Sequence, residues 1–231
     1  MELKVKAIVI SSKDSGDKDK IVTLFCLNSG ILQAKLKSVR AMNAKLKFAK
    51  EPFCFGEFIL SSKNGFFTVV SAECVDSFYS ISQNYQKFVE GAEILKIVKQ
   101  VVLENQENNN LFVDTLQSMK ILAYDNVQQN LVLVKYLLNL FYNEGYEISH
   151  YKCINCGNKL GESRFLDLNS GEVVCASCKT DYCLRISFSQ SSLLRVISQT
   201  KFDKLKTITL SQNNLDNVLS ILKKNLERKI S

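Results

Sequence analysis

The chain has 231 residues, of which 46% are hydrophobic, and a formal net charge of +7. This apolar content suffices for one large domain or two modest ones and excludes an intrinsically disordered chain. The first residues alternate charged and apolar side chains and lack the apolar core of a signal peptide, and the richest apolar run, residues 131–141, contains Lys135 and is too short to cross a bilayer. We therefore expect a folded cytoplasmic protein with no membrane segment, and the positive charge favours a polyanionic partner.

The first 76 residues have the pattern of short antiparallel strands. Alternating side chains predict a first strand over residues 3–10 and a polar turn over residues 11–18. Later strands are predicted over residues 21–27, 31–39, 53–62 and 66–75, with Asn64-Gly65 as a hairpin turn. This pattern indicates a small Greek-key barrel of the OB type, although other five-stranded barrels fit it nearly as well.

Residues 30–50 form the most basic stretch of the chain and contain no acidic residue. Such a run is typical of a phosphate-binding strip, and a solvated loop is the competing interpretation. The candidate DNA-binding residues in it are Lys35, Lys37, Arg40, Lys45 and Lys47. Nearby aromatic residues can stack on bases, but about half must face the barrel interior, so a core role is expected for any one of Phe53, Phe55, Phe66 and Phe67.

After residue 80 the apolar residues recur every three to four positions, which predicts helices. The expected helices cover residues 81–104, residues 111–124, and a third that is capped by Asn126 and runs to residue 143, with Gly145 as its stop. The third has a broad apolar face and should lie at the core of a bundle. Towards the C-terminus, Ser189 or Ser191 caps a short helix through residue 198, and Ser211 caps a final helix over residues 215–230.

Four cysteines between the predicted helices have the spacing of a four-thiolate zinc site. Cys153 and Cys156 form one CxxC pair and, after eighteen intervening residues, Cys175 and Cys178 form another. Because protein thiolates fill all four coordination positions, the predicted Zn²⁺ is structural rather than catalytic. The alternatives are two disulfides or unligated thiols, or a ligand set that includes His150, the only histidine. We expect three of the other cysteines to be small core residues: Cys26, Cys54 and Cys74.

The chemistry of an enzyme is not visible in the sequence. The chain has no GxxxxGK[ST] phosphate-binding loop, and nothing marks His150 as a general base. Asp17 and Asp19 are interleaved with Lys18 and Lys20, so a turn with local ion pairs is expected there rather than a magnesium site. We therefore expect a binding protein and not an enzyme.

Three segments carry a resemblance to the RecO family of bacterial recombination mediators. Residues 16–25, GDKDKIVTLF, look like the family's segment that links the first two strands. Residues 37–40 with residues 52–58 are similar to its basic stretch and next strand, although Ser38 replaces the usual glycine and Ala41 the second arginine. Gly145-Tyr146 and the two CxxC pairs resemble its passage from helical domain to knuckle.

This resemblance implies a protein that binds single- and double-stranded DNA and anneals complementary strands without nucleotide hydrolysis. It implies that the protein helps to load the RecA recombinase onto DNA coated by single-strand binding protein, in the RecF pathway of DNA repair. The implied partners are RecR and the C-terminal tail of single-strand binding protein, and the implied location is the cytoplasm, at the nucleoid.

Pattern and resemblance together predict an α+β multidomain protein. Its expected parts are an OB-fold DNA-binding barrel (residues 1–78), the first part of a helical domain (79–149), an inserted four-cysteine zinc knuckle (150–184) and the second part of the helical domain (185–231). The competing hypothesis is a zinc-stabilised protein-binding scaffold without DNA activity. A metal-dependent nuclease is a third, and it would require Mg²⁺-dependent cleavage.

Overall fold

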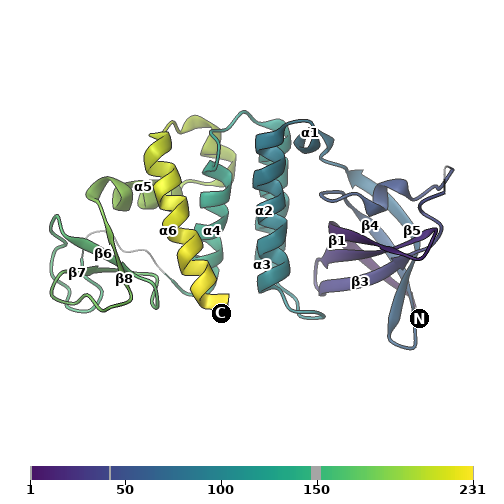
Figure 1. Cartoon of the computed structure of the whole chain (residues 1–231), viewed down its shortest axis with the longest axis horizontal. Helices are drawn as coiled ribbons and strands as arrows, with labels where there is room; N and C mark the ends of the chain where they lie inside the picture. The colour runs from purple at the N-terminus through teal and green to yellow at the C-terminus, as the bar shows by residue number, and fades with distance from the viewer. Residues whose placement is uncertain (1, 42, 147–151, 231) are drawn as a thin grey trace. The chain divides into compact units, whose positions relative to one another are not determined.

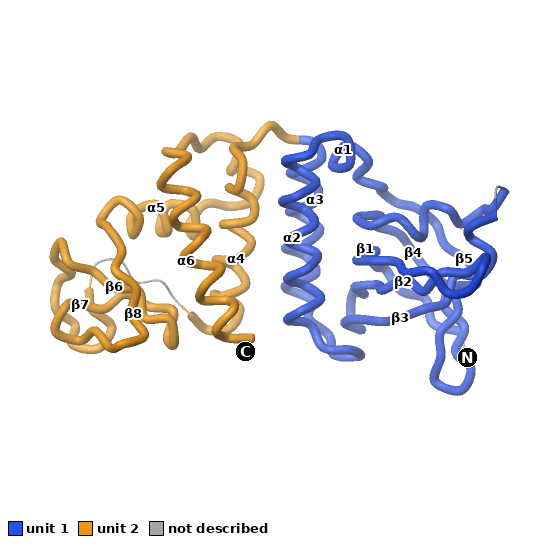
Figure 2. Tube along the Cα trace, viewed as in Figure 1, with its two compact units in different colours: residues 1–124 blue, residues 125–231 orange. Residues whose placement is uncertain are grey.

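The computed structural model describes residues 2–41, 43–146 and 152–230, and the chain forms two compact units. Figure 2 shows the first unit, residues 1–124, in blue and the second, residues 125–231, in orange. The division falls inside the stretch 79–149 that the sequence assigns to the first part of a helical domain. Each unit has its own core.

The first unit is built on a closed five-stranded barrel (Figure 1). Its strands are β1 (Glu2–Ser15), β2 (Asp19–Cys26), β3 (Gly30–Leu36), β4 (Phe55–Lys63) and β5 (Phe66–Asp76). They close in the order β1-β2-β3-β5-β4, and all pairs are antiparallel except the short β3–β5 pair, which joins Ala34 to Phe67 and Lys35 to Thr68. This Greek-key order confirms the expected OB-type barrel.

Three helices complete the first unit: α1 (Tyr79–Ser82), α2 (Tyr85–Val101) and α3 (Asn109–Tyr124). Inside the barrel, apolar side chains such as Val9, Leu24 and Phe58 are fully buried. Outside it, aromatic rings join the barrel to the helices: the Phe112 ring of α3 lies 5.3 Å from that of Phe25, and the Phe88 ring of α2 lies 5.7 Å from that of Phe53, between centroids. Both faces of part of the barrel wall are therefore apolar.

The first strand is longer than predicted, and the predicted turn over residues 11–18 is wrong. Strand β1 continues to Ser15, and its last residues pair with the start of β2, Asp14 opposite Lys20. Only residues 16–18 turn, with Gly16 at a φ of 72°. Polar side chains made this segment look like a loop, but a hairpin arm needs no apolar face where both of its sides meet solvent.

The second unit packs α4 (Leu131–Asn143) against α5 (Phe188–Gln199) and α6 (Gln212–Ile230), with a 3₁₀ helix, η2 (Phe202–Thr207), beside α4. A small sheet in the order β7-β6-β8 is made of β6 (Arg164–Asp167), β7 (Val173–Cys175) and β8 (Cys183–Ile186). The sheet and the cysteines come between α4 and α5 in the chain, as expected for a knuckle inserted into a helical domain. Ten of the thirteen residues of α4 are buried, which confirms its place in the core.

Several helix starts differ from the prediction by a few residues. The helix expected from residue 81 divides into α1 and α2, and the Asn84 side chain caps α2 by accepting from the Lys87 amide at 3.1 Å. Helix α4 begins after Asn130, not Asn126. Helix α5 has Ser187 as its cap, in a reciprocal capping box with Gln190, rather than Ser189 or Ser191. Gly145 follows α4 with a φ of 89°, as a helix stop requires.

Candidate metal centre and nucleic-acid interface

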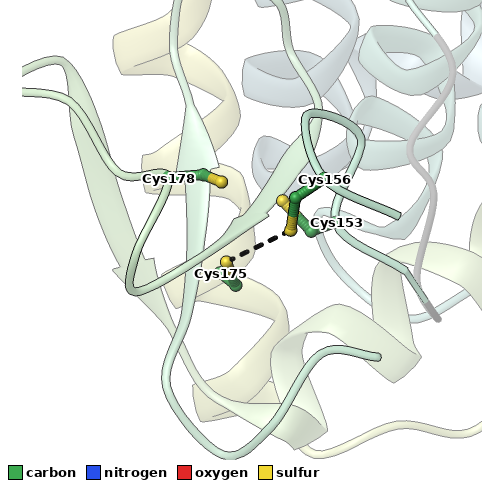
Figure 3. Close-up of side chains that lie close together, drawn as sticks. All are labelled: Cys153, Cys156, Cys175 and Cys178. Atoms are coloured by element: carbon green, nitrogen blue, oxygen red, sulfur yellow. Dashed lines mark hydrogen bonds between the residues drawn. The ribbon is translucent and has the colours of Figure 1, made fainter. Parts of the chain in front are cut away.

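The structure brings the four predicted zinc ligands together in the second unit. The sulfurs of Cys153, Cys156, Cys175 and Cys178 all lie within 4.8 Å of one another, and Figure 3 shows them gathered around a common centre. The Cys156 and Cys175 sulfurs are 3.8 Å apart. A tetrahedron with Zn–S bonds of about 2.3 Å has S···S edges of about 3.8 Å, so the spacing fits a four-thiolate metal site.

Two backbone turns position these sulfurs. In the first, Gly157 has a φ of 72° and its amide donates to the Cys153 carbonyl at 2.8 Å, which returns the chain past the first pair. In the second, the Cys178 amide donates to the Cys175 carbonyl at 3.1 Å, directly after β7. The Cys153 amide donates to the Asn158 carbonyl at 2.8 Å. Local hydrogen bonds thus fix the geometry of each CxxC pair. Strand β7 of the three-stranded sheet ends at Cys175 and holds the second pair opposite the first.

The electrostatics of the cluster favour a bound cation. Burial opposes the charged form of Cys153, but backbone amides of Cys175, Cys156 and Asn155 donate to its sulfur and lower its pKa to about 6. Cys178 shares hydrogen bonds with Cys156, Cys175 and Cys153, and these raise its pKa to about 12. Four sulfurs this close repel one another as thiolates, and a divalent cation removes that repulsion.

The predicted DNA-binding residues lie around one end of the barrel. Lys35 is on β3; Lys37 and Arg40 are exposed in the turn that follows β3; Lys45 is exposed ahead of the 3₁₀ helix η1 (Lys47–Lys50), and Lys47 begins that helix. Val39 and Ala49 are buried against the barrel core and anchor the segment that carries these cations. The segment that carries these cations therefore packs against the barrel.

Two members of the basic strip are engaged by acidic residues of the β1–β2 hairpin. The Lys35 ammonium lies 2.9 Å from the Asp19 carboxylate, and an Arg40 guanidinium nitrogen lies 3.3 Å from that of Asp14. The Ser38 amide at 2.8 Å, together with Lys35, holds the pKa of the Asp19 carboxyl below its usual value. The Lys20 ammonium, with Arg40, does the same for Asp14. The sequence predicts local ion pairs for Asp19 within its turn; its partner Lys35 is instead on the neighbouring strand β3, diagonally across from it, since Lys35 is directly opposite Ile21.

A pocket of about 460 Å³ opens where β3 and β5 pair. Its lining includes Ile21, Lys35 and Thr68, and Phe66 stands at its edge with 79% of its surface exposed. Glu104 also lines the pocket and accepts a hydrogen bond from the Gln33 amide group at 2.7 Å. In OB-type barrels the β2–β3 face and the β1–β2 and β4–β5 loops are the usual nucleic-acid surface, and this pocket lies on it.

The other candidate residues have structural roles or lie elsewhere. Phe53 is buried against α2, and Phe55 packs 6.3 Å from Phe112, so neither presents a free ring, whereas Phe66 does. Cys26 and Cys54 are buried as expected, but the prediction for Cys74 is wrong: that residue is exposed, although its sulfur lies 3.6 Å from that of Cys54. His150 lies outside the described residues.

Barrel and knuckle together define an OB-barrel protein whose helical unit carries a knuckle with four clustered cysteines. The family model described as "Recombination protein O N terminal" matches residues 1–78, and "Recombination protein O C terminal" matches residues 83–231. The chain therefore belongs to the RecO family of DNA repair proteins. None of the helices in the described part of the chain is both long enough and apolar enough to cross a membrane.

Curated relatives share the family's name along nearly the whole chain. "DNA repair protein RecO" of Acetivibrio thermocellus is 26% identical over 99% of this chain and 92% of its own length. The protein of the same name from Caldanaerobacter subterraneus is 29% identical over 90% of this chain and 85% of its own length. That from Clostridium novyi is 23% identical over 95% and 86%.

Proposed function

We propose that this protein is a DNA-binding recombination mediator. It anneals complementary strands and helps to load the RecA recombinase onto single-stranded DNA that is coated by single-strand binding protein. It acts in the cytoplasm at the nucleoid, and it does so by binding rather than by catalysis. The observation that carries the proposal is the OB-type barrel with Lys35 and the exposed ring of Phe66 on its usual ligand-binding face, followed in the chain by the basic segment 37–47.

The barrel offers both elements that sequence-tolerant binding of single strands needs. Lys37 and Lys45 are exposed cations, and Lys35 and Arg40 become available when a phosphate replaces their carboxylate partners. Phe66, at the edge of the β3–β5 pocket, is the ring on which a base stacks. Lys47, on the 3₁₀ helix, extends the positive strip.

Annealing needs no reacting group in this scheme. Two strands pair slowly because their phosphates repel each other, and cations that screen one backbone while leaving its bases accessible lower that barrier. Lysine and arginine side chains on a barrel surface meet both requirements. No nucleotide hydrolysis is required, because base pairing itself supplies the free energy.

A Zn²⁺ ion would be held by Cys153, Cys156, Cys175 and Cys178, whose sulfurs lie within 4.8 Å of one another. It would supply no chemistry to a substrate, since four thiolate ligands leave no open coordination position. Its role is to fold the segment between α4 and α5. The protein partners are RecR and the acidic C-terminal tail of single-strand binding protein, as the family implies.

The test is annealing of two complementary labelled oligonucleotides, bare and coated with single-strand binding protein, without nucleotide and at several salt concentrations. Wild-type protein should accelerate pairing, and the effect should fade as salt rises. A Lys35→Ala, Lys37→Ala, Arg40→Ala variant should lose most of the acceleration. The matched control removes three exposed cations from α2 and α3, Lys96→Ala, Lys99→Ala and Lys120→Ala, and should retain it.

Absence of acceleration at every salt concentration, with protein that is folded and zinc-loaded, would move the assignment to a protein-binding scaffold. Cleavage of either strand that depends on added Mg²⁺ would instead support a nuclease. Equal loss of activity in the two triple variants would show that net charge matters and the barrel strip does not.

A further inference from the structure

The second unit contains a basic pocket that the barrel hypothesis does not use. It has a volume of about 620 Å³ and lies between the knuckle and α5. Its cationic members are Lys152 and Lys159 of the knuckle, Arg164 of β6, and Arg195 of α5, and none of the described residues that line it is acidic. Leu160, Phe188 and Val196 supply apolar surface. The lining thus combines positive charge with an apolar wall.

Two of these cations face each other across the first CxxC turn. Lys152 and Lys159 form an isolated antiparallel bridge, and both side chains are exposed. Side chains directly opposite in such a pair are about 4.5–5.5 Å apart at Cβ, and like charges placed there destabilise the pair. An anion between the two ammonium groups reverses the sign of that interaction. The fold therefore holds two lysines in a position that an anionic ligand stabilises.

The opposite side of the pocket presents an aromatic ring. Phe188 is 64% exposed, and the buried Arg164 guanidinium lies 4.5 Å from its ring centroid. Arg164 is held in place by bonds to the Gly161 carbonyl at 2.8 Å and the Ser191 hydroxyl at 3.0 Å. The ring is thus supported on one side by a fixed cation, while much of its surface remains open to solvent. Such a ring is a stacking platform for a base.

We propose that this pocket is a second contact site for single-stranded DNA, in which the basic rim meets phosphates and Phe188 stacks on a base. A single strand suits the pocket better than a duplex, because the faces of bases in a duplex are covered by their neighbours. The volume is that of a site for a small ligand, enough for a short part of a strand. Stacking on a single aromatic residue is sequence-tolerant.

The consequence is that one chain has a strand site on each of its two units. This inference rests on the proposed function, since it assumes that the protein binds single strands at all. A protein with two such sites can hold two complementary strands at once, and pairing then takes place within one complex rather than between two. Annealing should accordingly depend on the knuckle pocket as well as on the barrel.

The test is a titration of the full, zinc-loaded protein with a fluorescent oligothymidylate of about ten nucleotides. It is done at low salt and at a protein concentration above the dissociation constant, so that it reports stoichiometry. Wild-type protein should bind two oligonucleotides per chain, and the Lys152→Ala, Lys159→Ala variant should bind one. In the wild-type protein, the two phosphate contacts should contribute about 1.4 to the salt slope of the second binding step, the step that the variant lacks. The matched control, Lys204→Ala with Lys224→Ala, changes two exposed lysines elsewhere in the unit and should still bind two.

A second variant separates stacking from charge and keeps the test independent of the cysteines. Phe188→Leu retains an apolar side chain at an exposed position, so it should fold normally, yet it should reduce ultraviolet crosslinking of a 5-iodouracil strand to α5 several-fold. Zinc content and melting temperature are measured for every variant, because Lys152 adjoins Cys153. A folded, zinc-loaded double variant that still binds two strands overturns the inference.

The outcomes distinguish this inference from the proposed function. If wild-type protein binds one strand and the barrel triple variant abolishes it, the proposed function stands and the second site does not exist. If wild-type protein binds no strand, the proposed function fails. If the Lys152→Ala, Lys159→Ala variant binds DNA normally but loses a short acidic peptide that ends in an aromatic residue, the pocket is a peptide site and the inference is overturned.

Discussion

Replacing Asp19 by asparagine should strengthen the binding of single-stranded DNA. The Asp19 carboxylate lies 2.9 Å from the Lys35 ammonium and also accepts from the Ser38 amide at 2.8 Å. The asparagine side chain keeps one oxygen to accept from Ser38, so the turn after β3 retains its tether. What is removed is the negative charge that competes with phosphate for Lys35.

The magnitude follows from the exposure of the ion pair. The Lys35 side chain is 43% exposed and that of Asp19 is 25% exposed, so solvent screens this ion pair and it is weak. The wild-type protein must break this ion pair to bind a phosphate, which lowers its DNA affinity by at most about fivefold. Asp19→Asn should gain that factor in affinity. The unfolding free energy should fall by the same small amount.

The salt dependence gives a sharper measurement than the affinity. In the wild-type protein a phosphate that displaces Asp19 leaves a carboxylate that recruits a cation, so little net counterion release results. In Asp19→Asn the same contact releases a counterion, and the salt slope for a single strand should become steeper by about 0.7. Fluorescence anisotropy of a labelled oligonucleotide from about 50 to 200 mM salt measures both quantities.

The control makes the same charge change in another ion pair of the barrel. Glu57 on β4 pairs with Lys4 at 2.7 Å, on a different part of the wall, and Glu57→Gln should leave the slope unchanged. Equal slopes for Asp19→Asn and wild-type protein, or equal increases in both variants, would show that Lys35 does not contact phosphate. Adding Lys35→Ala to Asp19→Asn should return the slope to its wild-type value.

Three further outcomes are expected. Gly30→Ala should lower the unfolding free energy by about 2–5 kcal/mol in urea denaturation, because residue 30 has a φ of 64° and an added Cβ would lie 2.0 Å from the Gln106 carbonyl oxygen. The control Gly65→Ala has a φ of 79° but open space around it, so it should lower the unfolding free energy by only about 1–2 kcal/mol, and equal losses in the two variants would contradict the clash. Cys175→Ser should lower zinc content, folded yield and melting temperature, whereas Cys74→Ser, outside the cluster, should leave zinc content unchanged; full zinc loading of Cys175→Ser would contradict the ligand assignment. In acid, the stability that the lowered carboxyl pKa values contribute should be retained down to the unfolded-state carboxyl pKa of about 4 and should be lost as pH drops through the lower folded-state values; it is measured as the difference in unfolding free energy between the wild-type protein and Asp14→Asn, Asp19→Asn or Glu57→Gln, and a difference that already shrinks at pH 6 would contradict the assignment.

The sequence predicts well those parts of the structure that depend on the spacing of cysteines and on the alternation of apolar residues along the chain. A CxxC turn places its two sulfurs through backbone hydrogen bonds within five residues, such as that from Gly157 to Cys153, so the cysteine spacing alone indicates a metal site. Alternating apolar residues similarly indicate strands whose one face lies in a barrel core. Gly145 marks the end of α4 because a left-handed residue there needs no information from elsewhere in the chain.

Helix starts were less predictable, because several positions within a few residues can begin a helix. Helix α4 starts after Asn130 rather than after Asn126, and Ser187 rather than Ser189 or Ser191 caps α5. The choice depends on which turn lets the apolar face of the helix reach the core, a free energy that a local pattern does not contain.

The charge environment of the barrel strip was decided only by tertiary structure. Residues 30–50 contain no acidic residue, yet pairing of β1, β2 and β3 brings Asp14 and Asp19 against Arg40 and Lys35. Likewise, Lys152, Lys159 and Arg195 are scattered in the sequence and share one pocket. By itself the sequence determined the barrel pattern and the metal-ligand spacing, because both depend on neighbours in the chain. Which charges meet across strands depends on register and on packing between distant segments, and only the folded chain specifies those.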